Sequence, residues 1–481
     1  MELINKEGRM TRRESLKRAA GAGAFMILPA GLARGYAANQ KLNIGIIGLS
    51  GQGQRDAKEL LKQGENIAAI CDVDSTFLDL RTSDYPKAKK YTDFRKMIES
   101  EKLDGVVVAT PDHTHAYISV WAMKHGVNTY CQKPLCKTVH EARIMAKVAA
   151  ETKVITQMGT FNMGQLETIR SGVLGEITEV HVSTDRPIWP QGFTRPTGGD
   201  PVPSTLDWDI WLGPAAFRPF KARYPEGHAV YTPPPEKQHQ LDFKSAGLSP
   251  IPPVGVLYHP FVFRGWLDFG SGALGDIASH SMNVIFMALE LGPPSAVDIV
   301  GTSGMTKDMY PDWSILRFEW PQRGVHPPLK IFWYDGGKVP PKEITGGGRG
   351  GMVWIGTKGS LPAGRGPFFD PNTVAPSGPP RGRGGAGSRP VQIGAPQDEV
   401  HKDWCDAVKA GKQAPCHFGY SGPFTEAYQL GNVALRVGHR IEWDARAFRV
   451  TNSREANQYL THEYRKGWDM KAIAGSAAYN V

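Results

Sequence analysis

The residues Ile44-Gly-Ile-Ile-Gly-Leu-Ser-Gly-Gln-Gly53 decide the fold. A short run of β-branched residues passes directly into glycines, and residues 54–63 are polar with two leucines, which predicts a strand, a tight turn and a helix. Glycine suits such a turn because it tolerates positive φ, and amides at a helix N-terminus can hold a pyrophosphate. The dinucleotide fingerprint G-x-G-x-x-G is met at Gly48 and Gly53, but Ser50 occupies its middle position. A glycine-rich turn without a ligand is therefore the alternative.

Asp72 favours the dinucleotide site. It follows Gly53 by nineteen residues and comes directly after the apolar run 67–71, where a second strand should end. A carboxylate at this place can accept both ribose hydroxyls and would repel a 2′-phosphate. We therefore expect the cofactor to be NAD and not NADP.

Strands and helices continue to alternate up to about residue 160. Apolar runs at 103–110, 127–131 and 154–158 alternate with helical stretches at 116–125 and 139–151, a pattern that predicts an α/β domain with a parallel sheet. Ligands of such sheets bind at the carboxyl ends of the strands. The residues expected there to contact the cofactor are Gly48, Ser50, Gly51, Gln52, Gly53, Asp72, Thr110, Pro111, Asp112, His115, Gln132, Lys133 and Gly159.

The pattern changes after about residue 163. Long strand-like runs, separated by proline-rich loops, predict an α+β domain with a large, mainly antiparallel open sheet; they lie at 177–184, 315–320 and 330–333. Helical stretches at 398–410 and 422–440 precede a polar tail. Glycine-rich residues 346–351 and 377–388 are expected to be surface loops. We thus expect a signal peptide over 1–38, a Rossmann domain over 39–162 and a substrate-binding domain over 163–481.

The N-terminus resembles a twin-arginine export signal. Arg12-Arg13 precede a mildly apolar, alanine- and glycine-rich run from Ala19 to Leu32, and Gly35-Tyr-Ala37 offers a small-x-small cleavage site. Ser15 departs from the pattern, which prefers a large apolar residue there, and an ordinary basic N-terminus is the alternative. Because this route carries folded proteins, it suits a periplasmic protein that must acquire a dinucleotide in the cytoplasm.

The composition argues against a nucleic-acid partner, a membrane span and a disulfide framework. The net charge is +9, of which the first 38 residues contribute +4, and no basic helix with interleaved aromatic residues is present, so nucleic acid is not expected as a partner. Beyond the leader no apolar stretch approaches the roughly 20 residues of a membrane span. Five cysteines do not indicate a disulfide framework, and Cys131 and Cys136 are interpreted as small buried residues.

Lys133 is the first candidate for chemistry. It precedes Pro134, so its backbone should be extended and its side chain should leave the end of a strand. A lysine there could hydrogen-bond a substrate hydroxyl or assist its deprotonation. A solvated lysine explains its position equally well.

A second candidate lies in the stretch Gly270–His280, which predicts a helix from about 275 to 291, ended by Gly292-Pro-Pro294. Asp276 and His280 are four residues apart, so both can point at one small molecule, with the histidine moving a proton. An ordinary surface pair is the alternative, and on spacing alone it is the commoner one.

Other residues favour a sugar and disfavour a metal. Neither an H-E-x-x-H nor a paired-cysteine spacing is present, and His113 and His115 are expected at a strand end that faces the nicotinamide, so no metal is expected. Sugar sites combine aromatic planes with hydrogen-bonding groups. The residues of this kind are Arg186, Tyr258, Arg264 and Trp266.

These pieces together resemble the Gfo/Idh/MocA oxidoreductases, the glucose-fructose oxidoreductase and inositol dehydrogenase group, and particularly their exported branch. The resemblance extends from Lys41 to Asp469 and rests on the glycine turn, Thr110-Pro-Asp-His-Thr-His115, Cys131-Gln-Lys-Pro-Leu135, Gln157-Met-Gly159, Thr184-Asp-Arg-Pro-Ile-Trp-Pro190 and Gly272-Ala-Leu-Gly-Asp276 through His280. Ser50 and Gln132 depart from the family, which commonly has glycine and glutamate at these positions.

The resemblance implies a reaction. In this family the lysine of the E-K-P motif lies beside the nicotinamide and the substrate, which is Lys133 here, and the aspartate and histidine of the second domain correspond to Asp276 and His280. It implies hydride transfer between a ring carbon of a sugar or cyclitol and NAD, with histidine taking the hydroxyl proton, lysine stabilising the alkoxide and aspartate orienting the substrate.

Two other functions stay open. A relative that cleaves glycosides would oxidise a sugar carbon transiently, eliminate the aglycone and return the hydride. A binding protein with a vestigial fold would need neither Lys133 nor His280. The resemblance also implies a homo-oligomer that pairs through the open sheet of the second domain.

Overall fold

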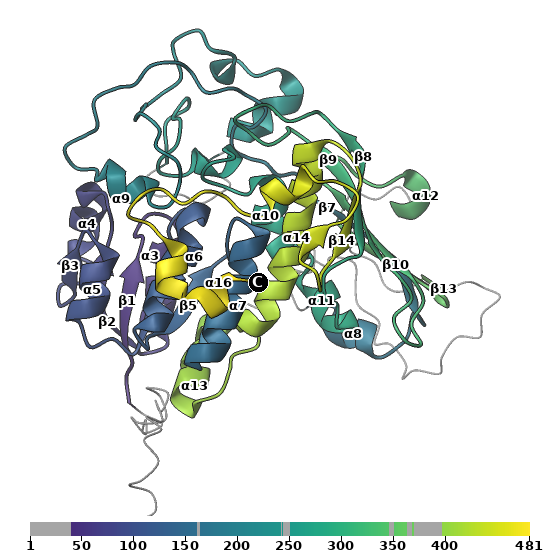
Figure 1. Cartoon of the computed structure of the whole chain (residues 1–481), viewed down its shortest axis with the longest axis horizontal. Coiled ribbons are helices and arrows are strands. Elements are labelled where there is room, and N and C mark those ends of the chain that lie inside the picture. Colours follow the sequence, from purple (N-terminus) through teal and green to yellow (C-terminus); the bar gives the residue numbers. More distant parts are fainter. Residues whose placement is uncertain are drawn as a thin grey trace, which may run out of the picture.

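The computed structural model describes residues 40–160, 164–241, 243, 251–345, 351–362, 368–369 and 397–481. The signal peptide predicted over 1–38, the loop predicted over 377–388 and residues 346–350 lie outside these described residues. Figure 1 shows a smaller sheet with its helices on one side of the molecule and a larger sheet on the other.

The first sheet is parallel and has six strands in the order β3-β2-β1-β4-β5-β6, as a Rossmann fold requires. Its strands are β1 (Asn43–Ile47), β2 (Asn66–Cys71), β3 (Lys89–Tyr91), β4 (Gly105–Val108), β5 (Asn128–Gln132) and β6 (Thr156–Gly159). The helices that connect them are α3 (Gln52–Lys62), α4 (Ser75–Thr82), α5 (Phe94–Ser100), α6 (Asp112–Lys124) and α7 (Val139–Thr152). The predicted fold class is confirmed, and β1, β4 and β5 are almost entirely buried, as central strands covered on both faces should be.

Residues 73–102 carried no prediction, and they form α4, β3 and α5. Asp74 and Asp93 start the two helices, because their side chains accept hydrogen bonds from the amides of Thr76 and Arg95. The edge strand β3 is only three residues long and mostly exposed, so it has no apolar run by which to be recognised.

The second sheet has nine strands in the order β13-β12-β11-β7-β10-β9-β8-β14-β15. Its strands are β7 (Ile177–Ser183), β8 (Ala296–Thr302), β9 (Ser314–Trp320), β10 (Leu329–Tyr334), β11 (Met352–Gly356), β12 (Gly359–Leu361), β13 (Phe368–Phe369), β14 (Ile441–Asp444) and β15 (Arg449–Val450). Every neighbouring pair is antiparallel except β7 and β10, which are parallel. The expected large, mainly antiparallel sheet is therefore confirmed.

Most of the remaining helices pack on one or the other of the two sheets and their connections. The α-helices are α8 (Leu166–Arg170), α9 (Trp208–Leu212), α10 (Gly272–Ser281), α11 (Asn283–Leu289), α12 (Lys342–Thr345), α13 (Gln397–Ala410), α14 (Phe418–Val437), α15 (Met470–Ala474) and α16 (Ser476–Tyr479). Short 3-10 helices are η1 (Ala229–Tyr231), η2 (Pro235–Leu241), η3 (Val262–Gly265) and η4 (Ala456–Tyr459). Among the described residues no helix is both long and apolar enough to cross a membrane.

The single helix predicted from 275 to 291 is wrong, because α10 and α11 are separate. They meet at Met282, which ends the first helix and precedes the second. The buried amide group of Asn283 is held from outside by the hydroxyl of Tyr420 (2.9 Å) and the thiol of Cys416 (3.9 Å). This break is accompanied by contacts to residues more than 130 positions later in the chain, which the local pattern of apolar residues cannot predict.

The C-terminal helices return to the first sheet. Val400, Trp404 and Val408 of α13 belong to the same apolar cluster as Leu42 and Ile44 of the first strand region. A side chain at Gly105 would lie 2.7 Å from the Trp404 ring, so the glycine makes room for α13. Figure 1 shows α14 alongside α7 between the two sheets, so the last part of the chain joins both halves.

Candidate active site

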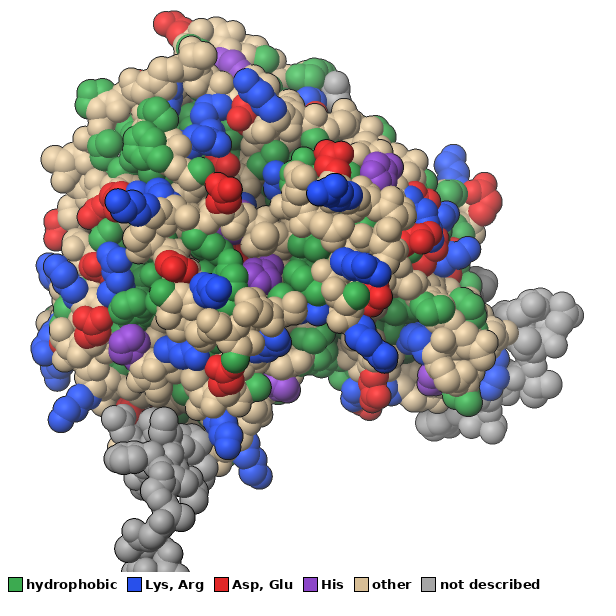
Figure 2. All heavy atoms as spheres, viewed as in Figure 1, with side chains coloured by type: hydrophobic (Ala, Val, Ile, Leu, Met, Phe, Trp, Pro, Cys, Tyr) green, Lys and Arg blue, Asp and Glu red, His purple; other side chains and the backbone are tan. Residues whose placement is uncertain are grey.

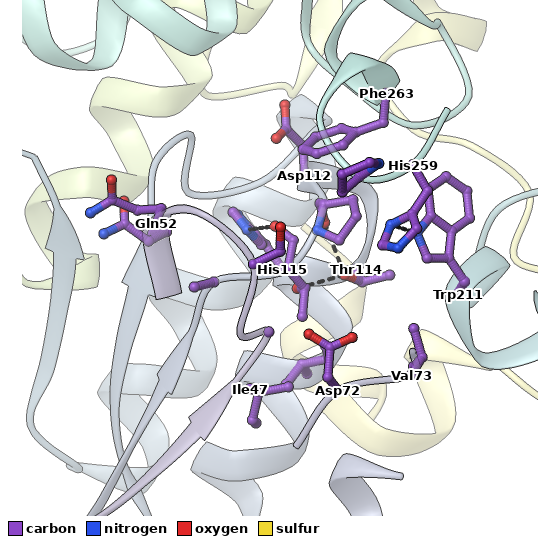
Figure 3. Close-up of a pocket in the computed structure, with 18 of the residues that line it drawn as sticks. Ile47, Gln52, Asp72, Val73, Asp112, Thr114, His115, Trp211, His259 and Phe263 are labelled. Atoms are coloured by element: carbon purple, nitrogen blue, oxygen red, sulfur yellow. Dashed lines mark hydrogen bonds between the residues drawn. The ribbon is translucent and has the colours of Figure 1, made fainter. Parts of the chain in front are cut away.

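A pocket lies where the carboxyl ends of the first sheet meet the second half of the chain (Figure 3). The first domain contributes Gly48, Ser50, Gly51, Gln52, Asp72, Thr110, Pro111, Asp112, His115, Gln132 and Lys133. The facing side contributes Ile210, Trp211, His259, Pro260, Phe261, Phe263, Arg264 and Trp468. Eleven of the thirteen expected cofactor residues thus line one cavity; Gly53 and Gly159 do not.

The glycine turn is closely packed. Gly48 has φ of 90°, and a side chain there would lie 2.6 Å from the Ala109 carbonyl oxygen. A Cβ atom at Gly53 would lie 1.8 Å from the carbonyl oxygen of Gly48. Only glycine at position 53 therefore allows the start of α3 to pack this closely against the turn that follows β1. No side chain caps α3, and the first amides of a helix have no partner within it. Together with the open pocket beside Ser50 and Gly51, this turn fits a pyrophosphate.

Asp72 ends the second strand and reaches the same pocket. Its two oxygens accept hydrogen bonds from the amides of Leu49 (2.7 Å) and Asp74 (3.0 Å). Burial raises the pKa of this carboxyl group, and the two backbone hydrogen bonds oppose the shift. Each oxygen keeps a second lone pair, so the carboxylate can still accept ribose hydroxyls.

Lys133 follows β5, three strands along the sheet from β2 and Asp72, and at this end of the pocket it meets the second half of the chain. Its Nζ lies 2.9 Å from Oδ1 of Asp276 and 3.2 Å from the carbonyl oxygen of the same residue. Arg264 binds the same Oδ1 through Nε at 3.1 Å. Burial alone would raise the pKa of Asp276, but the charges of Lys133 and Arg264 outweigh it and hold the pKa well below its usual range. Lys133 and Arg264 line the pocket, whereas the buried Asp276 lies behind them.

His280 follows Asp276 by one helical turn of α10. Its Nδ1 lies 3.3 Å from the hydroxyl of Thr160, which comes directly after β6. Burial lowers the pKa of His280 to about 3, and the nearby charge of Lys133 adds to this effect. The imidazole is therefore neutral near pH 7, the form that can accept a proton.

The two histidines of the Thr110–His115 segment behave differently. Both lie in the first turn of α6, which begins at Asp112 and not at 116 as predicted. His115 lines the pocket and contacts the carbonyl oxygens of Pro134 and Thr110, both at 2.7 Å. His113 is fully buried between Trp211 and Phe269, so the expectation that it faces the nicotinamide is wrong. Burial lowers the pKa of His113 to about 3.

A buried network that the sequence did not reveal supports Gln132. Its amide Nε2 donates to both oxygens of Asp56, each at 2.9 Å, and the same carboxylate contacts Nε2 of His401 at 3.1 Å. Gly159 leaves room for this side chain, since a Cβ there would lie 2.8 Å from Gln132 Cδ. A glutamate at 132 would oppose the Asp56 carboxylate, which explains why glutamine stands here. No sequence signal connects Asp56 with His401, because they are 345 residues apart.

Of the four expected sugar-binding residues, only one lines the pocket. Arg264 lines the pocket, but Arg186 does not, and its Nη1 pairs with Asp185 at 2.6 Å. Tyr258 and Trp266 are almost completely buried in an aromatic cluster, where the Trp266 indole donates to the Leu257 carbonyl. The phenylalanine and tryptophan rings that do line the pocket are those of Phe94, Trp211, Phe261, Phe263 and Trp468.

All five cysteines are buried and free, which confirms the interpretation of Cys131 and Cys136. Over the part of the chain that the structure describes, no group of three or more His, Cys, Asp or Glu residues could hold a metal ion.

Comparisons with known proteins agree with this geometry. Residues 42–160 match the family described as "Oxidoreductase family, NAD-binding Rossmann fold" (GFO_IDH_MocA). "Inositol 2-dehydrogenase 4" of Saccharopolyspora erythraea is 25% identical over 201 residues, covering 40% of this chain and 60% of that protein. A "Glycosyl hydrolase family 109 protein" of Stenotrophomonas maltophilia is 24% identical over 259 residues, covering 50% of this chain and 54% of that protein. The chain thus spans little more than half the length of these curated relatives.

A solved structure matches over most of the chain. The WlbA dehydrogenase from Bordetella pertussis, in complex with NADH and UDP-GlcNAcA, superposes with a TM-score of 0.52 at 14% identity and covers 84% of this chain and 99% of that one. This likeness shows the two-part fold. Residues 42–160 are thus a domain of the Gfo/Idh/MocA oxidoreductase family with its NAD-binding Rossmann fold.

Proposed function

We propose that this protein is an NAD-dependent oxidoreductase that acts on a ring carbinol of a sugar or cyclitol. The observation that carries the proposal is the ion pair between Lys133, at the carboxyl end of a Rossmann strand, and Asp276, from a helix of the other half. It sets an ammonium group into the pocket at the end opposite Asp72. Bound NAD would supply the acceptor of a hydride there.

The proposed roles of the chain's own residues follow from their contacts. Lys133 Nζ donates a hydrogen bond to the substrate oxygen and stabilises negative charge on it. His280 does not line the pocket, and its role, receipt of the hydroxyl proton by its neutral imidazole, is proposed on the family resemblance. Asp276 holds both Lys133 and Arg264 and does not line the pocket, so it orients the cations that meet the substrate.

Two measurements test this function. The purified protein is denatured and any released dinucleotide is identified, with NAD expected and NADP or no nucleotide counting against the proposal. Turnover is then measured over a panel of neutral sugars and cyclitols. The His280→Ala variant is expected to lose roughly 10²- to 10⁴-fold in kcat, as for removal of a general base. Full turnover by this variant with NAD bound would refute the assignment.

A glycoside-cleaving reaction is the second candidate. It is favoured by the relatives named as glycosyl hydrolase family 109 proteins and by an "Alpha-N-acetylgalactosaminidase" of Bacteroides fragilis, 28% identical over 154 residues. Product analysis separates the two. An oxidoreductase yields a keto-sugar together with NADH, whereas the cleaving enzyme releases the aglycone and leaves NAD unchanged.

We also propose export through the twin-arginine pathway. Its support is the Arg12-Arg13 pair with the apolar run that follows it, all outside the described residues. Cell fractionation should place the protein in the periplasm and an Arg12→Lys, Arg13→Lys double variant in the cytoplasm.

Pairing of two copies through the large sheet is proposed on the family resemblance. Side chains of β9 alternate between buried and half-buried, so one face of the sheet is packed and the other is open. Figure 2 shows one face of the molecule, on which charged groups of both signs mix with apolar ones. Light scattering of the purified protein should give a mass above that of one chain.

A further inference from the structure

Asp112 is a buried carboxyl group on the pocket wall, and one of its oxygens makes no well-formed hydrogen bond within the described residues. It is the first residue of α6, is 3% exposed and lines the pocket. Among the described residues its Oδ2 makes no hydrogen bond of good geometry; the Ser271 hydroxyl, which likewise makes none, is the side-chain donor that interacts with this carboxyl group and lowers its pKa. Buried polar atoms are normally satisfied, so an oxygen of this kind beside a cavity indicates that a ligand completes it.

The helix itself does not account for this side chain. Pro111 occupies the cap position of α6, and no side chain caps the helix. Position at a helix N-terminus favours a carboxylate in general. Burial nevertheless raises the pKa of Asp112 to about 7, with the Arg264 charge opposing this and the Asp276 charge adding to it.

The cations near Asp112 are already engaged. Arg264 and Lys133 both bind Oδ1 of Asp276. Arg264 also donates to the Phe261 carbonyl at 3.0 Å, and its guanidinium lies 4.4 Å and 4.6 Å from the ring centres of Phe261 and Phe263. These contacts fix both cations on other groups, so near Oδ2 of Asp112 only the Ser271 hydroxyl is left among the described residues, and the oxygen can accept or share a hydrogen bond with a molecule in the pocket.

Two features of the pocket point to the substrate and not to the nucleotide. Figure 3 draws Asp112 at the Phe263 end of the pocket, away from Asp72. The phenylalanine rings supply apolar planes, and a sugar hydroxyl both donates and accepts, so it pairs with a carboxyl group in either protonation state. A carboxylate on the substrate would instead meet a second acid.

We propose that Asp112 is a substrate-binding residue whose Oδ2 forms a hydrogen bond with a hydroxyl group of a neutral sugar or cyclitol. The proposal rests on the function proposed above and adds a specificity determinant to it. It replaces the expectation that Asp112 contacts the cofactor.

The test compares Asp112→Ala and Asp112→Asn with Asp406→Asn, an exposed carboxylate on α13. NADH affinity is measured by calorimetry, and kcat and KM are measured with the best substrate of the neutral panel and with deoxy analogues of it. We expect Asp112→Ala to lower kcat/KM roughly ten- to hundredfold, mainly through KM, with the NADH dissociation constant within about twofold of wild type. Asp112→Asn, which keeps hydrogen-bonding atoms, should lose less, and one deoxy analogue should be insensitive to Asp112→Ala.

Each other outcome overturns a stated claim. Unchanged KM in Asp112→Ala with active wild-type enzyme overturns this inference alone. A large loss of NADH affinity returns Asp112 to the cofactor and overturns it too. If the wild type binds NADH but neither turns over nor binds any member of the panel, the proposed function fails and this inference fails with it.

Discussion

The two ends of the pocket are built in different ways. The nucleotide end consists of a glycine turn and Asp72, all within thirty residues of one domain, held by backbone contacts. The other end joins Lys133 to Asp276 and Arg264, more than 130 residues later. The first end is a local structure that a short sequence can encode, and the second exists only when both halves of the chain are packed together.

The largest effect is expected from Lys133→Met, which keeps much of the side-chain volume and removes the charge. Turnover should fall roughly 10²- to 10⁴-fold because the substrate oxygen loses its cationic donor, while NADH affinity stays nearly unchanged. Stopped-flow turnover and calorimetry measure the two quantities. Lys412→Met, at an exposed lysine, is the control. If Lys133→Met lost turnover and NADH affinity to the same extent, the two ends of the pocket would not have separate roles.

At the nucleotide end, Gly53→Ala should impair NADH binding, the quantity that Lys133→Met leaves nearly unchanged. The added Cβ would lie 1.8 Å from the Gly48 carbonyl oxygen, so the turn must shift. We expect the dissociation constant for NADH to rise at least about a hundredfold, or the domain to lose about 3 kcal/mol of stability. Gly292→Ala is the matched control, since nothing lies within 4 Å of its Cβ. Unchanged NADH affinity in Gly53→Ala would show that the turn holds no nucleotide.

Gln132→Glu tests the buried hydrogen-bond network of Gln132, Asp56 and His401. The new carboxylate would face the Asp56 carboxylate, to which Gln132 Nε2 donates two hydrogen bonds of 2.9 Å in the wild type. Such repulsion raises the pKa of the new group above its unfolded value, so the variant approaches wild-type stability below about pH 4.3 and loses stability as the pH rises. We expect a loss of about 2 kcal/mol at pH 8 by denaturant unfolding. The exposed Gln458→Glu should show no such pH dependence.

Asp112→Asn should stabilise the protein at neutral pH. Because the folded pKa of about 7 lies above the ordinary 3.8, the native state holds a proton that the unfolded state has lost, and wild-type stability falls as pH rises between these values. The variant should therefore gain about 1–2 kcal/mol at pH 8 and gain nothing below pH 4. Thermal unfolding across this range measures the effect, and a pH-independent difference would contradict it.

The smallest effect is expected from Asp72→Ser. It removes the charge that disfavours a 2′-phosphate, so the ratio of NAD to NADP affinity should fall by about tenfold. Calorimetry with both nucleotides measures the ratio. An unchanged ratio would mean that Asp72 serves the turn only, through its bonds to Leu49 and Asp74.

Sequence reasoning reached the local structures and missed those made at long range. The glycine turn, the parallel sheet and the pocket position of Lys133 follow from neighbouring residues, and all three are found. The partnership of Arg264 with Asp276 and that of Asp56 with His401 depend on how distant segments pack. Tyr258 and Trp266 resemble ligand-facing aromatics in sequence, but they belong to a core cluster of the second half.

The central claim is that this pocket binds NAD with its nicotinamide at Lys133. A crystal structure of the purified protein with NADH tests it most directly. We predict adenosine ribose hydroxyls on Asp72, the pyrophosphate at the first turn of α3, and the nicotinamide C4 within about 5 Å of Lys133 Nζ. A nucleotide bound elsewhere, or bound with its nicotinamide at the Asp72 end, would contradict it.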